Sequence, residues 1–328
     1  MKQKTKIIQI ALITIASLFV VTMITVIYGL SLLQAPEPNN RQLERFVVKK
    51  GEGVATISSR LKEKGFIKSD LLFKIYYRLN SDKYQIQAGS FELSPAMDVA
   101  AILEILGEGA DDLWITLPEG MRREEIAQSL QQYSLTAYDA DEFLTQTVAL
   151  EGKLFPDTYL VPKEITTQAL VLLMNNTFEK RIEPFREEIE DSKYTLNEIL
   201  TMASLLEREA RDFEQMKLIS GVLWKRLGSG MPLQVDATLQ YAKGYDSDLG
   251  SWWAVPRQAD KNLDSSFNTY LNPGLPPKPI CNPGINAIEA ALRPESSDYL
   301  FYIHDNQGRV HFGRNLEEHN QNIDQYLR

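Results

Sequence analysis

The sequence contains very little cysteine, little histidine and no excess of positive charge. Its 328 residues include one cysteine, Cys281, so an intramolecular disulfide is excluded. The three histidines have no metal-binding spacing such as HExxH, so neither a metal nor another cofactor is expected. The formal net charge is −9 and basic clusters are absent from the sequence, which makes nucleic acid a poor candidate for a partner. The sequence also lacks a Gly-x-Ser-x-Gly motif, so serine-hydrolase chemistry has no support.

The sequence does have one long uncharged run, at residues 7–33. About 20 apolar helical residues cross a bilayer, whereas the hydrophobic region of a cleaved signal peptide usually has about 7–15. Only a weak cleavage site, Leu-Gln-Ala at residues 33–35, follows the run. Lysines at positions 2, 4 and 6 precede it, so the positive-inside rule places residues 1–6 in the cytoplasm. We predict a single-pass protein of the inner (cytoplasmic) membrane, with a transmembrane helix at residues 7–33 and its bulk on the periplasmic or extracellular side.

The rest of the chain divides into a linker and two blocks. Residues 34–45 are a linker rich in Pro and Asn. Residues 46–110 follow a strand–helix–helix–strand–helix order without a concentration of His, Cys or paired acids, as in a small binding or spacer domain. Residues 111–328 form the larger block, and their mixed strands and helices without regular βαβ alternation indicate an α+β fold. Within it we expect helices over residues 166–190 and 195–227, a loop at residues 150–160 and a hairpin around residues 305–308.

The helix expected over residues 195–227 has a glutamate at the edge of its apolar stripe. On a wheel of about 100° per residue, Glu207 falls inside the stripe's edge, and Glu209 lies on the more solvent-facing flank. The stripe itself consists of Ile199, Leu200, Ala203, Leu206 and Ala210.

Two explanations of Glu207 remain open from this pattern alone. Arg211, four residues further on, could neutralise Glu207 on a half-buried helix surface. Alternatively, apolar surroundings raise the pKa of Glu207, and the group acts as a general acid near neutral pH. The two explanations conflict, because a nearby arginine would lower this pKa.

Later segments supply polar groups next to rigid turns. Three of these groups alternate in the segment QVDATLQY, and three more precede a Pro/Gly turn. Together with one perturbed acid, they are typical of a cleft for a polar, uncharged polymer such as a glycan. The candidate lining residues are Gln234, Asp236, Thr238, Asn268, Thr269 and Tyr270.

Several separated motifs resemble a known family. They are EGKLFPDTY at residues 151–159, ASLLERE at 203–209, QxDxT at 234–238, FNTY at 267–270, GLPP at 274–277 and NPG at 282–284, followed by shorter matches at 299–302, 308–312 and 318–320. In order and spacing they resemble the endolytic murein transglycosylases, the MltG/YceG-like family, over nearly the whole chain after the N-terminal run. The family's usual N-terminal half is a LysM-like domain, and residues 46–107 look like it.

The resemblance implies a membrane-anchored lyase that cuts peptidoglycan glycan strands internally. Such an enzyme breaks the β-1,4 bond between N-acetylmuramic acid and N-acetylglucosamine and leaves a 1,6-anhydromuramyl end. The family's catalytic glutamate maps onto Glu207, and Glu209 is expected to support it. Glu151, Asp157, Tyr159 and Ser204 fall within the matching motifs and join the six lining residues as expected substrate contacts. The expected partners are peptidoglycan glycan strands and the inner membrane, with peptidoglycan synthases as a further candidate.

The sequence departs from the family's usual pattern in three loops. Asp236-Ala237-Thr238 stands where the family often has Asp-Pro-Thr. Lys278 stands where a glycine is usual in Pro-Pro-Gly-Pro, and Ser265 to Phe267 stand where Ser-Pro-Tyr is usual. These changes affect loop shape and leave the acid in place.

Two alternatives to the lyase remain. A hydrolase of the muramidase type needs two carboxylates, and Glu151, Asp157 or Asp236 could accompany Glu207. A lyase needs only one, because the muramic acid C6 hydroxyl is a nucleophile already tethered to the substrate. The second alternative is a glycan-binding scaffold of the cell-wall machinery without activity, against which the acid and the polar lining both argue.

Overall fold

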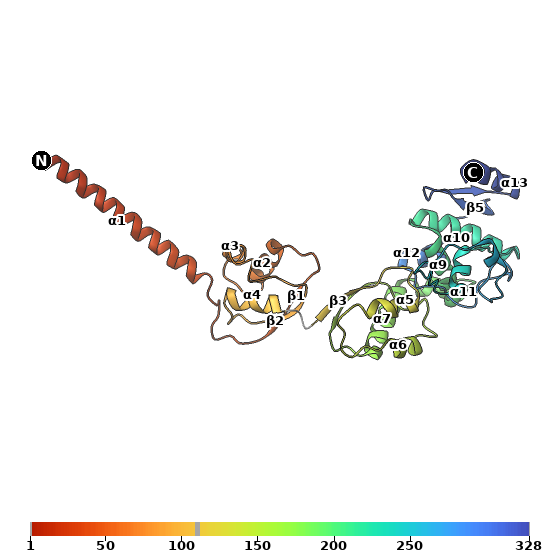
Figure 1. Cartoon of the computed structure of the whole chain (residues 1–328), viewed down its shortest axis with the longest axis horizontal. Coiled ribbons are helices and arrows are strands. Elements are labelled where there is room, and N and C mark those ends of the chain that lie inside the picture. The colour runs from red at the N-terminus through yellow and green to blue at the C-terminus, as the bar shows by residue number, and fades with distance from the viewer. Residues whose placement is uncertain (1, 109–111, 328) are drawn as a thin grey trace. The chain divides into compact units, whose positions relative to one another are not determined.

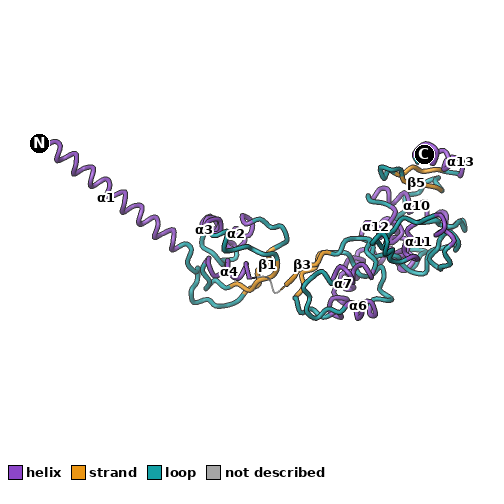
Figure 2. The backbone as a smooth tube through the Cα atoms, viewed as in Figure 1, coloured by secondary structure: helices purple, strands orange, loops and turns teal. Residues whose placement is uncertain are grey.

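The computed structural model describes residues 2–108 and 112–327, with side chains described for residues 17–107 and 112–327. The described chain is a mixture of helices and short strands, as expected for an α+β fold (Figure 2). It divides into two compact units (Figure 1). The N-terminal unit contains Met1–Trp114 and Tyr159–Lys163, and the C-terminal unit contains Ile115–Thr158 and Glu164–Arg328.

The N-terminal unit has the predicted strand–helix–helix–strand–helix order after a first helix, α1 (Lys2–Ser31). Strands β1 (Glu44–Val48) and β2 (Gly89–Leu93) pair antiparallel, with Phe46 opposite Phe91. Ser69 begins α3 as an N-cap, because its side chain accepts a hydrogen bond from the Leu72 N–H. The buried side chains of Phe46, Leu61 and Phe73 belong to one apolar core. The helices around this core are α2 (Val54–Glu63), α3 (Asp70–Leu79) and α4 (Val99–Glu108).

The predicted membrane span at residues 7–33 falls partly outside the described side chains, which begin at residue 17. In the portion of the chain that was described, we find no helix with both the length and the apolar character required to cross a membrane.

Helices dominate the C-terminal unit. Helix α9 (Leu196–Glu209) lies at its centre, where residues 199–206 are all buried. It begins with a capping box, in which Thr195 and Glu198 satisfy each other's backbone N–H groups. Helices α10 (Phe213–Gly228) and α12 (Ile285–Leu292) contribute to the same apolar core.

The remaining elements of this unit are one further long helix, α7 (Thr167–Ile182), and several short helices and strands. The short helices are α5 (Arg123–Leu130), α6 (Ala140–Gln146), α8 (Arg186–Asp191), α11 (Asp236–Lys243) and α13 (Leu316–Tyr326), with 3-10 turns η1 (Glu183–Phe185) and η2 (Gln258–Asn262). Strands β5 (Phe301–His304) and β6 (Val310–Gly313) form the predicted hairpin. A further pair, β3 (Asp112–Thr116) and β4 (Thr158–Pro162), is divided by the boundary between the units.

Three predictions about these elements are wrong. The expected helix over 195–227 is two helices, because Ala210 is extended (φ −132°, ψ 153°) and Asp212 caps α10 by accepting from the Gln215 N–H. The expected helix over 166–190 is interrupted at Pro184, which has no N–H to donate. The expected loop at residues 150–160 ends in strand β4, which begins at Thr158.

Candidate active site

Glu207 lies in the last turn of α9 and is half-buried. Its Oε2 accepts a hydrogen bond of 2.9 Å from the backbone N–H of Gly284. Burial, helped by the nearby Glu119 carboxylate, raises the pKa of Glu207 to about 7 against the lowering effects of the Gly284 N–H and Arg208. Glu119 lies so close to Gly284 that a Cβ there would meet its Oε1 at 1.8 Å. A glycine at 284 therefore permits both acidic side chains to lie beside the same backbone amide.

The arginines near Glu207 do not neutralise it. Because α9 ends at Glu209, Arg211 is exposed and is not one helical turn from Glu207. Within the described ranges, no ion pair joins these two side chains. The Arg208 guanidinium lies 3.9 Å from the centre of the Trp253 ring. Of the two explanations of Glu207 that the sequence leaves open, the geometry favours the acid with a raised pKa.

Glu207 lines a cavity of about 520 Å³. Its walls are formed by the end of α9, the start of α11 and the hairpin residues His304 and Gly308. A second cavity of about 680 Å³ shares Glu209, Asp236 and His304 with the first. The two cavities are therefore neighbours along one surface.

Glu209 belongs to both cavities, and its predicted solvent-facing position is wrong. It is half-buried, and its Oε2 accepts a hydrogen bond of 3.0 Å from the Tyr302 hydroxyl in β5. Burial raises the pKa of Glu209 to about 7, and the charge of Asp236 adds to the rise. The wheel failed here because Glu209 is the last residue of α9, where β5 contacts it.

Three of the expected lining residues do line a cavity. Asp236, the first residue of α11, accepts a hydrogen bond of 2.6 Å from the Tyr270 hydroxyl. Gln234 is exposed and has a φ of 57°, a left-handed conformation that is uncommon for a residue with a side chain. Together with Glu209, these residues line the larger cavity.

Four other expected contacts are buried and use their polar groups inside the protein. The Asn268 amide donates to the carbonyl oxygens of Lys261 and Leu263, at 3.0 and 2.8 Å. The hydroxyls of Thr238 and Thr269 lie 3.0 Å apart. The fourth, Ser204, donates to the carbonyl of Thr201 and accepts from the N–H of Ile280. None of the four lines either of the two cavities, and their hydrogen bonds connect the segments that do.

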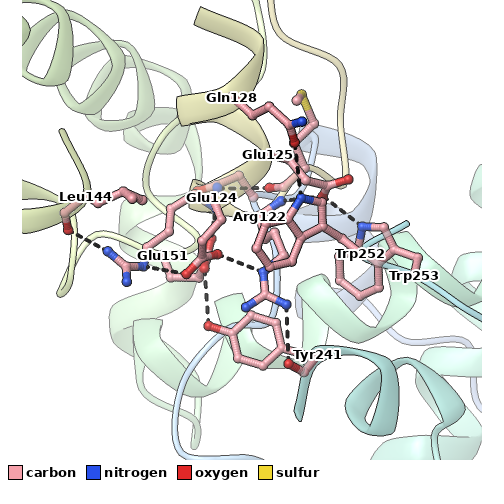
Figure 3. Close-up of polar contacts among 12 residues, drawn as sticks. Arg122, Glu124, Glu125, Gln128, Leu144, Glu151, Tyr241, Trp252 and Trp253 are labelled. Carbon is pink, nitrogen blue, oxygen red and sulfur yellow. Dashed lines mark hydrogen bonds and ion pairs between the residues drawn. The ribbon is translucent and has the colours of Figure 1, made fainter. Parts of the chain in front are cut away.

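The three residues expected from the 151–159 motif also lie away from these cavities. Glu151 is 3% exposed and accepts hydrogen bonds from the Arg123 N–H and the Asn282 amide, both at 3.0 Å. It also accepts from the Tyr241 hydroxyl at 3.3 Å (Figure 3). Burial raises the pKa of Glu151 to about 7. The other two are Asp157, whose carboxylate pairs with Arg181 at 2.8 Å, and Tyr159, which is buried in β4 within the N-terminal unit.

Sequence reasoning missed several residues of the site, among them Tyr302 and Arg226. Tyr302 holds Glu209, and the buried Arg226 lines the larger cavity and donates to the carbonyl of Leu300 at 2.7 Å. Tyr302 lies in a motif that matches the family, and that match could have identified it. No sequence pattern identified Arg226. Within the described residues, we find no group of three or more His, Cys, Asp or Glu side chains that could hold a metal ion.

Comparisons with known proteins agree on one family. Two relatives named endolytic murein transglycosylase are similar to this chain over 92% of its length. The relative from Bacillus subtilis (strain 168) is 32% identical, with 89% of its own length covered. The relative from Streptococcus pneumoniae serotype 2 (strain D39 / NCTC 7466) is 31% identical, and the chain spans only 61% of that protein.

A solved structure and a family model extend this agreement. The crystal structure of a YceG-like protein from Listeria monocytogenes is similar with a TM-score of 0.55 and 31% identity, covering 85% of this chain and 99% of that one. The model of the YceG-like family matches residues 46–325. The chain therefore belongs to the YceG-like family.

Proposed function

We propose that this chain is an endolytic murein transglycosylase in which Glu207 is the single general acid and base. One observation carries the proposal: a half-buried glutamate with a pKa raised to about 7 lines a cavity of about 520 Å³. The name of the relatives supports the reaction and the substrate class, since both are called endolytic murein transglycosylases.

The chemistry requires one group that first gives and then takes a proton. Protonated Glu207 donates its proton to the glycosidic oxygen, and the bond between that oxygen and C1 of N-acetylmuramic acid breaks. The resulting carboxylate then accepts the proton of the C6 hydroxyl of the same sugar while that oxygen bonds to C1. The products are a 1,6-anhydromuramyl end and a free 4-hydroxyl on N-acetylglucosamine, and water does not enter the reaction. A pKa near the working pH suits a group that must occupy both protonation states.

A specific observation keeps a muramidase-type hydrolase as the second candidate. A hydrolase needs a second carboxylate within reach of the bond, and Glu209 and Asp236 line the same cavity as Glu207. Glu151 and Asp157 are poorer partners, because the first is buried among its hydrogen-bond donors and the second pairs with Arg181. Tyr302 and Tyr270, which donate to Glu209 and Asp236, favour a supporting role for these two acids.

The experiment for this proposal is cleavage of purified peptidoglycan by the full chain in detergent. An endolytic enzyme shortens the average strand early and releases fragments of intermediate length. Release of terminal disaccharides alone would contradict internal cutting. Absence of cleavage under conditions where the strands bind would leave the glycan-binding scaffold as the better account.

We propose further that residues 7–33 anchor the chain in the cytoplasmic membrane, with residues 1–6 in the cytoplasm and the catalytic part outside. The length of the uncharged run and the three preceding lysines support this orientation. A reporter active only outside the cytoplasm, fused after residue 328, should be active in intact cells. A soluble mature protein that begins near residue 36 would contradict the anchor.

We also propose that residues 34–45 are a linker, residues 46–110 a LysM-like domain, and residues 111–328 the catalytic domain. The strand–helix–helix–strand–helix order of the small block supports this division. Binding of peptidoglycan strands by the full chain, compared with a chain that lacks residues 46–110, would show whether the small domain contributes. Peptidoglycan synthases are a candidate partner class, which co-purification from membranes would test.

A further inference from the structure

A third cavity, of about 360 Å³, lies in the C-terminal unit. One wall is the polar side of α5, with Glu125 and Gln128, together with Gln132, which follows the end of the helix. The opposite wall is the loop that follows α11, with Tyr245, Ser251 and Trp252. We propose that this cavity is a second carbohydrate subsite, which takes an uncharged N-acetylhexosamine of the glycan strand on which Glu207 acts. The proposal thus rests on the proposed function and adds a binding site to it.

The aromatic residues of this cavity are held in place. The rings of Tyr245 and Trp252 lie 5.1 Å apart between centroids, at 58° to one another. The Trp252 Nε1–H points to Gln128 Oε1 at 3.4 Å, and the Arg122 guanidinium lies 4.7 Å from the centre of the Trp252 ring (Figure 3). Arg122 is itself buried and donates to Glu124 at 2.7 Å. The indole therefore needs little ordering when a ligand binds, which favours affinity.

The loop that carries the two aromatic residues is closed on itself. Asp246 and Ser251 exchange two backbone hydrogen bonds, at 2.9 and 3.2 Å. The Asp246 side chain accepts from the N–H groups of Asp248 and Leu249, both at 3.1 Å. Tyr245 and Trp252 lie directly outside this small turn, which fixes their spacing.

The side chains of the cavity suit an uncharged sugar. Amides such as those of Gln128 and Gln132 donate and accept, as hydroxyl and N-acetyl groups require. Aromatic side chains present flat apolar surface to the C–H face of a sugar ring, while their polar atoms fix its orientation. Glu125 is the charged residue of the lining, so an anion such as a phosphate or an acidic sugar would meet a carboxylate rather than a cation. We therefore assign the cavity to N-acetylglucosamine rather than to a charged muramyl residue.

A single residue connects this cavity to the cavity of Glu207. Trp253 follows Trp252, and its Nε1–H donates to Glu125 at 2.7 Å. The Arg208 guanidinium lies over the Trp253 ring, and the Trp253 backbone carbonyl accepts a hydrogen bond of 2.9 Å from the Gln240 amide. Arg208 and Gln240 line the cavity of Glu207, whereas Glu125 lines the third cavity. A glycan strand in the Glu207 cavity would thus have a further sugar-binding surface beyond Trp253, as internal cutting of a polymer requires.

Direct binding tests the subsite. The probe is a hexamer of β-1,4-linked N-acetylglucosamine. It is added to the full chain in detergent, and every chain tested carries Glu207→Gln so that no cleavage occurs. Tyr245→Ala and Gln128→Ala should each weaken hexamer binding about tenfold, as expected for contacts that contribute strongly to an interface. Gln131→Ala is the matched control, because this exposed neighbour of α5 does not line the cavity. Trp252→Ala is less informative, since it also removes a neighbour of the buried Arg122.

Unchanged hexamer affinity in both Tyr245→Ala and Gln128→Ala would overturn the subsite, even if the wild type cleaves peptidoglycan. Equal weakening by Gln131→Ala would also overturn it, because the effect would then not belong to the cavity. A different outcome separates the two proposals. If Tyr245→Ala and Gln128→Ala weaken hexamer binding and Gln131→Ala does not, but the wild-type chain does not cleave peptidoglycan, the sugar site is supported and the lyase is contradicted. The same variants in the active chain should raise the KM for long strands and leave kcat within about twofold of the wild type.

Discussion

Three glutamates of the C-terminal unit have a pKa raised to about 7, and two of them, Glu151 and Glu207, differ in nearly everything else. Glu151 is 3% exposed, and three donors from different segments satisfy its carboxylate. Glu207 is half-buried, accepts from the Gly284 N–H and lines a cavity. Burial raises the pKa at both positions, so the shift alone does not distinguish a structural acid from a catalytic one. Access to a cavity does, and it makes Glu207 the candidate for chemistry and Glu151 the candidate for stability.

The largest expected effect is the loss of cleavage rate when Glu207 is substituted. Glu207→Gln keeps the size of the side chain and removes the transferable proton, so the cleavage rate should fall by about 10²–10⁴-fold. Glu209→Gln is the matched control, since this residue lines the same cavity and should leave a measurable fraction of the rate. The rate is measured as fragments released from purified peptidoglycan. Full activity in Glu207→Gln would remove the assignment.

Substitution of Glu151 is expected to affect the stability of the protein. Glu151→Ala removes the acceptor of the Tyr241 hydroxyl and of the Arg123 N–H and leaves the Asn282 amide with only the Met121 carbonyl, which should lower the free energy of unfolding by about 1–3 kcal/mol. Glu207→Ala should change it much less, because water can reach a half-buried site. Denaturant unfolding of both variants measures the difference. If the two variants lose equal stability, the distinction between the two glutamates is lost.

Glu151 and Glu207 should both contribute to the pH dependence of the free energy of unfolding. A carboxyl whose pKa is about 7 in the folded protein, and near 4.3 when unfolded, binds its proton more tightly in the folded state. Its contribution is therefore fully present below the unfolded value and is lost as the pH rises through about 7. The free energy of unfolding should decline between about pH 4.5 and 7.5, and less steeply in Glu151→Gln. An unchanged slope in that variant would show that Glu151 titrates normally.

The smallest effects concern the polar residues of the later loops. Gln234→Ala, in an exposed residue that lines the larger cavity, should lower turnover a few-fold and leave the melting temperature nearly unchanged. Asn268→Ala removes two donors to backbone carbonyls in the interior, so its loss of activity should follow its loss of stability. Parallel measurement of melting temperature and rate separates the two cases. If Gln234→Ala lowers the melting temperature, the side chain stabilises the left-handed backbone at this position, and the loss of turnover cannot be assigned to the cavity.

The sequence predicted the position of Glu207 better than that of its neighbours, for physical reasons. Apolar periodicity reports the local face of a helix, and Glu207 is indeed half-buried at the edge of the stripe. The same wheel failed for Glu209 because Tyr302 in β5 contacts this last residue of α9, and it failed for Arg211 because the extended backbone of Ala210 ends the helix. Only the fold shows that β5 contacts Glu209 and that, among the described residues, no ion pair joins Arg211 to Glu207.

Polar loop residues were harder to assign from the sequence. A serine, threonine or asparagine next to a Pro/Gly turn suits both a ligand contact and a hydrogen bond that holds the turn. Ser204 and Asn268 have the second role in the structure, as their partners are backbone groups: the N–H of Ile280 for Ser204, and the carbonyls of Lys261 and Leu263 in the preceding loop for Asn268. Tertiary packing decides between the two roles, and a single sequence contains no signal of it.

The central claim is that one carboxylate, Glu207, performs the reaction without water. The most direct test is the mass of the new ends that the wild-type chain creates on purified peptidoglycan. A lyase leaves anhydromuramyl ends, each one water lighter than the reducing end that a hydrolase leaves. We predict anhydro ends from the first turnovers onward. Reducing ends would contradict the account and would require Glu209 or Asp236 as a second catalytic carboxylate.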